Sequence, residues 1–82
     1  MTDGKITWGT LIDHHVRGEC SLGIVWIRLD RQDLVTGIYT IFGPVKKIVP
    51  SDLEPMTLEL GKLAAELELI VELDYRNSFL VH

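Results

Sequence analysis

The segment LGIVWIRL, residues 22–29, decides the fold of this chain. Four apolar side chains in a row, at residues 24–27, make both faces of an extended strand apolar at this point. That pattern is typical of a central strand, a barrel strand or an interface strand. It differs from the alternation of a strand that has one face in water. We therefore place residues 22–29 at the centre of a sheet and add the other elements around it.

The N-terminal flank of this segment predicts one strand and one loop. Residues 6–12 place Ile6, Trp8 and Ile12 on one face at a period of two, which is the periodicity of a strand. Residues 13–20 are mostly polar and include a glycine. We therefore expect a loop between the first strand and the central one.

The C-terminal flank predicts two more strands. Polar residues 30–33 have the length of a hairpin connection. Residues 34–42 are rich in β-branched and aromatic side chains, which favour a strand. Residues 45–49 are expected to form a short fourth strand. Its Lys46 and Lys47 suit an exposed edge, where charged side chains discourage pairing with other chains.

An amphipathic helix is predicted after the strands. Ser51, with Glu54 three residues later, forms a capping box, which is a signal for a helix N-terminus. At helical spacing, one continuous face is apolar. It consists of Met56, Leu60, Leu63, Ala64, Leu67, Ile70 and Val71.

The end of this helix is ambiguous in the sequence. From residue 67 onward, apolar and acidic side chains alternate, and this alternation is the periodicity of a strand. We expect helix through Glu66 and on to Glu72, and a strand remains the alternative over residues 67–75. Residues 76–78 predict a turn, and residues 79–81 predict a short terminal strand that closes the sheet.

These elements predict a single α+β domain over residues 1–82. Its fold is a small antiparallel sheet or an SH3-like partial barrel of three to five strands, with one C-terminal amphipathic helix. An 82-residue chain with 46% hydrophobic and 24% charged residues is long enough for one globular domain. We expect the helix face that contains Met56, Leu60, Leu63 and Leu67 to pack across the open side of the sheet.

Two short motifs resemble small barrel proteins. The segment IVPSDLEP, residues 48–55, resembles the one that ends many SH3-like barrels, where a leucine in a short turn plugs the barrel mouth. The tetrapeptide FGPV, residues 42–45, is similar to one found in small RNA-associated barrels. These resemblances imply a barrel-like sheet, and they imply no activity.

Composition argues against several classes of protein. Eight basic and twelve acidic residues give a net charge of −4, whereas a general binder of nucleic acid or of anionic membranes needs an excess of cations. One cysteine cannot form a disulfide framework, and residues 1–5 lack the pattern of a signal peptide, so we expect a cytoplasmic protein. The longest uncharged stretch, residues 34–45, is too short to cross a membrane.

Apolar content also predicts association. A mean hydropathy of +0.19 is high for an acidic chain of this length. A small core cannot enclose so many apolar side chains, and the remainder usually lies in an interface. We therefore expect a homo-oligomer.

One cluster of residues could carry metal or nucleophile chemistry. Imidazole and thiolate groups ligate transition metals, but the spacing of these residues is not that of a structural zinc site. The five residues are Asp13, His14, His15, Glu19 and Cys20. We predict no metal, cofactor or catalytic site, and keep His14, His15 and Cys20 as the weak candidates for a metal. His15 with Cys20 is also a candidate nucleophile pair, but the sequence has no helix start beside the thiol to activate it.

The acidic residues are concentrated in the C-terminal element. Residues 52–74 contain seven acidic residues against Lys62 alone. An acidic face beside apolar residues is typical of a docking surface for a basic protein, although it is also typical of a solvated helix face. The predicted partner-binding residues are Glu66, Glu68, Glu72 and Asp74.

Taken together, these features predict a non-catalytic protein-interaction or regulatory module that self-associates and binds a partner with a basic surface. Two alternatives remain open. The first is a small metal-binding protein that uses His14, His15 and Cys20. The second is a subunit of an RNA-associated barrel that relies on a partner for its positive charge.

The domain should fold without a metal ion, because the candidate ligands lack the spacing of a structural zinc site. We expect thermal melts with and without a strong chelator to coincide. A large fall in melting temperature on chelation would support the metal-binding alternative instead.

Overall fold

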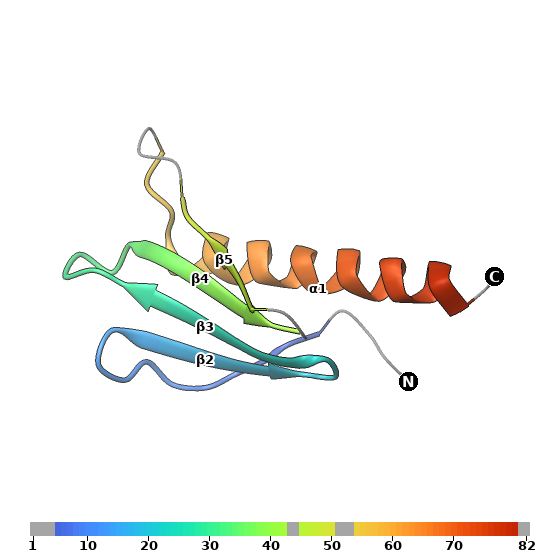
Figure 1. The fold of residues 1–82 in the computed structure, drawn as a ribbon. Helices are drawn as coiled ribbons and strands as arrows, with labels where there is room; N and C mark the ends of the chain where they lie inside the picture. The colour runs from blue at the N-terminus through green and yellow to red at the C-terminus, as the bar shows by residue number, and fades with distance from the viewer. Residues whose placement is uncertain (1–4, 43–44, 51–53, 81–82) are drawn as a thin grey trace.

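The chain forms one antiparallel sheet with a single helix on one of its faces (Figure 1). The computed structural model describes residues 5–42, 45–50 and 54–80. The five strands follow one another across the sheet in the order β1-β2-β3-β4-β5, so the α+β class predicted above is confirmed as an open sheet. The elements are β1 (Thr7–Trp8), β2 (His15–Cys20), β3 (Gly23–Leu29), β4 (Val35–Ile41), β5 (Val45–Ile48) and α1 (Leu58–Leu80).

The segment that decides the fold forms the central strand, β3, as predicted. Val25, Ile27 and Leu29 are buried on the inner face of the sheet, which the helix covers. Trp26 and Arg28 alternate with them and are exposed on the outer face. Both neighbouring strands pair with β3 over most of its length, which places it in the interior of the sheet.

The edge and hairpin predictions are also confirmed. β5 is an edge strand, and its Lys46 and Lys47 are exposed. The connection from β3 to β4 is the predicted short turn. In it Asp30 Oδ1 accepts hydrogen bonds from the backbone N–H groups of Gln32 and Leu34, at 2.8 and 3.0 Å. Such an Asx turn explains why this polar connection is so compact.

The predicted loop over residues 13–20 is wrong, because most of it is strand β2. Val16 and Gly18 are buried on the inner face, whereas Arg17 and Glu19 are exposed on the outer face. The polar residues of this segment therefore mark the outer face of a strand. Gly18 is required here, because a Cβ at this position would lie 2.5 Å from Ile6 Cγ2, closer than side chains approach.

The first strand is also shorter than the predicted residues 6–12. β1 ends at Trp8, and a tight turn centred on Asp13 and His14 leads into β2. Both turn residues have positive φ, 48° and 62°, and Ile12 and His15 exchange two backbone hydrogen bonds of 2.9 Å. This is the geometry of a type I′ hairpin turn, which matches the twist of the strands that it joins.

The helix begins later than the capping box predicted. Ser51 lies outside the described residues, and Glu54 is not helical. Met56 instead extends along β4, where its carbonyl accepts a 2.8 Å hydrogen bond from the N–H of Val35. Thr57 then caps the helix, since its Oγ1 accepts a 3.3 Å hydrogen bond from the N–H of Leu60.

The helix also continues further than predicted. Residues 67–75 are helical and not a strand, and the turn over residues 76–78 and the terminal strand from residue 79 are wrong as far as Leu80. Arg76 stabilises this extension. Its Nε donates to Glu72 Oε1 at 3.1 Å, one helical turn earlier, and its Nη2 donates to the Phe42 carbonyl at the end of β4.

The helix face that packs on the sheet differs from the predicted one. Gly61, Ala65 and Leu69 are buried, whereas Leu63 and Leu67 are 56% and 62% exposed. The cause is close approach, because a Cβ at Gly61 would lie 2.8 Å from Val35 Cγ2. Only a small residue lets the helix backbone come this near the sheet. Because Gly61 faces the sheet, Leu63 and Leu67 point away from it.

Leu69 and Leu67 provide a matched test of this packing. Leu69→Ala should lower the free energy of unfolding by about 2–5 kcal/mol, because it leaves a cavity in the core. Leu67→Ala changes the same side chain on the exposed face and should cost less than about 0.5 kcal/mol. Urea unfolding at a concentration too low for association measures both. Equal losses would contradict this orientation of the helix.

Candidate binding surfaces

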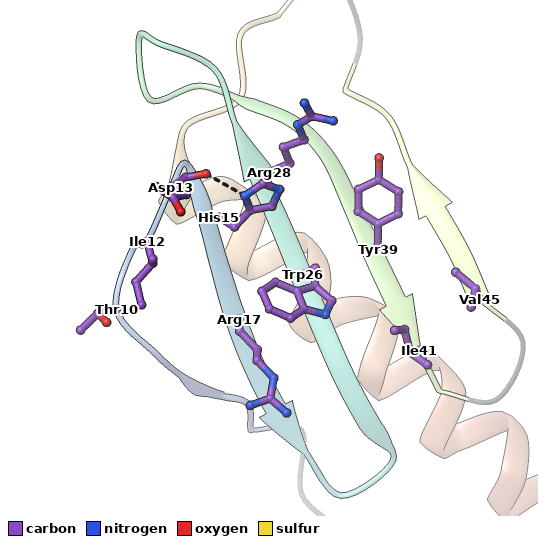
Figure 2. Close-up of a pocket in the computed structure, with 10 residues that line it drawn as sticks. All are labelled: Thr10, Ile12, Asp13, His15, Arg17, Trp26, Arg28, Tyr39, Ile41 and Val45. Carbon is purple, nitrogen blue, oxygen red and sulfur yellow. Dashed lines mark hydrogen bonds between the residues drawn. The ribbon is translucent and has the colours of Figure 1, made fainter.

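Two surfaces on opposite sides of the fold are candidates for function. The first, the outer sheet face, is the face of the sheet that α1 leaves open, and it forms a hollow of about 770 Å³ (Figure 2). Side chains from four strands and from the loop before β2 line it. They are Thr10, Ile12, Asp13, His15, Arg17, Trp26, Arg28, Tyr39, Ile41 and Val45.

Two aromatic rings form the floor of the outer sheet face. Trp26 on β3 lies directly opposite Tyr39 on β4 in the antiparallel register. The Arg17 guanidinium lies 5.9 Å from the centre of the Trp26 ring, and Lys47 Nζ lies 5.5 Å from that of Tyr39. His15 meets Trp26 edge to face at 6.3 Å. These contacts hold the rings in position and cover them with positive charge.

Charge on the outer sheet face is predominantly positive. Arg17, Arg28 and Lys47 are exposed there. Two acids partly offset them: Glu19, whose Oε1 lies 2.9 Å from Arg17 Nη1, and Asp13, which is exposed and lines the hollow. At the far end of the hollow, His15 Nδ1 donates a 2.7 Å hydrogen bond to the backbone carbonyl of Asp13, which fixes the ring against its own turn (Figure 2). The face therefore combines an apolar floor with guanidinium and ammonium groups.

The second surface, the exposed helix face, is the apolar side of α1 that points away from the sheet. Its members recur at intervals of three and four residues, so they lie along one stripe. They are Leu60, Leu63, Leu67, Ile70 and Val71, and each is at least half exposed. A helix with two apolar faces is unusual in an isolated monomer, because one of those faces remains in water.

Negative charge surrounds the exposed helix face. Glu59, Glu66 and Asp74 lie along this side of the helix, and none of them joins a salt bridge within the described residues. The two basic side chains of α1, Lys62 and Arg76, do not offset this charge because they contact other parts of the molecule. Lys62 Nζ lies 5.7 Å from the centre of the Trp8 ring, and Arg76 is held by Glu72 and by the Phe42 carbonyl.

The four predicted partner-binding acids are all on α1, but they do not form one free surface. Glu68 Oε2 lies 3.0 Å from Lys46 Nζ on β5, and Glu72 pairs with Arg76. Glu66 is half-buried and Asp74 is exposed. The structure thus divides the set into two acids with intramolecular partners and two on the side of the exposed helix face.

The candidate metal and nucleophile residues are not brought together. His14 and His15 lie at the start of β2, and Cys20 lies at its end, five residues and about 17 Å along the strand. The Cys20 thiol instead donates to the Gly23 carbonyl at 3.4 Å. Among the described residues, no group of three or more His, Cys, Asp and Glu side chains is arranged to hold a metal ion.

Sequence reasoning missed the outer sheet face as a surface. The interpretation of residues 13–20 as a loop gave no reason to place Arg17 beside Trp26, although the two residues pair on adjacent strands. A signal was present, because Val16, Gly18 and Cys20 alternate with larger polar residues at strand periodicity. Trp8, which the sequence places on one strand face with Ile6 and Ile12, lies on the inner side of the sheet, against Lys62 of the helix.

Comparison with known proteins gives no function for the chain, so the two surfaces are the basis for inferring one. No protein-family model, curated protein or solved structure matches the chain. Over the described residues, α1 is too rich in charged side chains to be a membrane span. Function therefore has to be inferred from the chemistry of the surfaces themselves.

The acidic residues of α1 should contribute little to the fold. Replacing Glu66, Glu68 and Glu72 together by Gln removes the pairs with Lys46 and Arg76, which are partly exposed to solvent. The free energy of unfolding should fall by no more than about 1 kcal/mol, because water screens such pairs. Urea unfolding measures this change. A loss of several kcal/mol would show that these acids are structural.

Proposed function

We propose that the protein is a non-catalytic interaction module that self-associates. The observation that carries this proposal is the presence of two exposed apolar surfaces on opposite sides of a two-layer fold. Domains of this size rarely keep two such surfaces in water when they act as monomers. We place the protein in the reducing cytoplasm, since its one cysteine has no second cysteine in the chain to pair with.

The composition of the outer sheet face supports binding to protein. Trp, Tyr and Arg are the residues most enriched at the energetic centres of protein interfaces. Trp26, Tyr39 and Arg17 lie together here, in a hollow with exposed Ile12 and Val45 at its borders. Aromatic rings held by neighbouring cations lose little side-chain entropy on binding, because they are already ordered.

The chemistry of the same side chains supports the non-catalytic part of the proposal. A nucleophile needs a base within hydrogen-bonding distance. His15 donates to its own turn, and Cys20 lies at the other end of β2. Within the described residues, the outer sheet face therefore offers groups for recognition and no pair for group transfer. The predicted basic partner of Glu66 and Asp74 remains part of this proposal.

A second candidate function is binding of single-stranded RNA on the outer sheet face. Stacking rings bordered by cations are the features that such sites use, and Trp26, Tyr39, Arg17 and Arg28 supply them. The cations already lie over the ring faces where bases would stack, and the chain carries a net charge of −4. Both features make protein the better-supported ligand.

Self-association can be measured directly on the wild-type chain. We expect sedimentation velocity and light scattering to give a mass above 9.3 kDa at micromolar concentration. This mass should fall towards the monomer value on dilution, as mass action requires. A mass of one chain at every concentration up to the millimolar range would refute the proposal.

A further inference from the structure

We propose that self-association is head to tail, with the exposed helix face of one copy docking on the outer sheet face of the next. This inference rests on the proposed self-association and names the two surfaces that meet. Each chain thereby carries both halves of one interface. The occupant of the hollow in Figure 2 is then helix α1 of a second copy of the same chain.

Electrostatics favour this pairing over the two symmetric ones. A pairing of two helix faces would bring Glu59, Glu66 and Asp74 against the same acids of the other copy. A pairing of two sheet faces would likewise oppose Arg17, Arg28 and Lys47 to themselves. Head-to-tail contact instead brings the acidic surface against the basic one. Apolar content alone would allow all three arrangements, so charge decides among them.

The widths of the two surfaces also agree. The four strands that line the hollow, at about 4.8 Å spacing, span roughly 14 Å, which accommodates one helix of about 10 Å diameter. The chain's own helix already occupies the inner face of the sheet in this manner (Figure 1). Docking a second helix on the outer face repeats the same α/β layering on the other side.

Particular side chains match across this contact. The ridge of Leu63 and Leu67 on the helix is apolar and exposed, and Trp26 and Ile41 in the hollow are apolar and partly exposed. Arg28 lies beside them and is exposed, so it can meet the acids beside the ridge. The predicted acids Glu66 and Asp74 thus receive a basic partner surface, which is supplied by another copy.

The orientation of the two surfaces excludes a closed dimer. They lie on opposite sides of the molecule, because one is the outer side of the sheet and the other is the outer side of the helix that covers its inner face. Two copies cannot satisfy both surfaces reciprocally. A heterologous contact of this kind gives an open chain or a ring of three or more copies.

Complementary variants test the inference. The sheet variant is Trp26→Thr, which keeps a strand-forming residue, and Arg28→Glu is a second version that leaves the aromatic floor intact. The helix variant is Leu63→Gln with Leu67→Gln, which removes apolar surface without changing charge or helix propensity. Gln32→Ala, in the turn between β3 and β4, is the control because its side chain lies on neither surface. Circular dichroism melts confirm that each variant is folded.

We expect each variant alone to be monomeric at concentrations where the wild type and the control associate, with a dissociation constant raised at least about tenfold. A mixture of the sheet variant and the helix variant should form a 1:1 complex. The sheet variant retains its helix face and the helix variant retains its sheet face, so one intact contact remains. This complex should weaken as salt concentration rises.

Other outcomes separate this inference from the proposed function. Association of the sheet variant alone with wild-type affinity would mean that helix faces pair with each other. Association of the helix variant alone would mean that sheet faces pair. Either result would overturn the head-to-tail contact and leave self-association standing, whereas a monomeric wild type would refute both. Unchanged association of Trp26→Thr with loss of binding to a fluorescent single-stranded oligoribonucleotide would assign the outer sheet face to RNA.

Discussion

The close approach of α1 to the sheet at Gly61 is the contact on which the rest of the structure depends. Because a Cβ at Gly61 would collide with Val35, this position sets the rotation of the helix about its own axis. Ala65 and Leu69 follow at intervals of four residues and complete the buried stripe. The other apolar residues between Leu58 and Tyr75 are consequently half-buried on the flanks of the helix or exposed to water.

That rotation produces a molecule with two unlike outer surfaces. The outer sheet face has aromatic rings and exposed cations, and the exposed helix face has leucines bordered by carboxylates. The sheet and helix α1 lie between these two surfaces. The net charge of −4 is therefore unevenly distributed, with exposed cations on the outer sheet face and carboxylates beside the exposed helix face.

β2 shows how a functional surface is built from residues that look unstructured. Its large polar side chains lie on the outer sheet face. Its inner face needs a glycine at residue 18, because the side chains of Ile6 and Trp8 lie over that position. Polarity and a glycine are also what a loop contains. The same strand carries Arg17 beside Trp26 and holds His15 and Cys20 at its opposite ends, so one element contributes to the basic aromatic surface and keeps these two side chains apart.

The sequence by itself determined the α+β class, the central strand, the lysine-bearing edge strand and the concentration of acids on the C-terminal element, because each depends on local composition or short periodicity. Tertiary structure alone decided which face of α1 is buried, since Leu67 and Leu69 are chemically identical and differ only in their position relative to Gly61. It likewise decided that residues 67–75 are helical, because the helical and strand patterns coexist there and packing selects between them. The alternation over residues 16–20 indicates a strand, but which elements lie beside that strand depends on contacts between residues far apart in the chain.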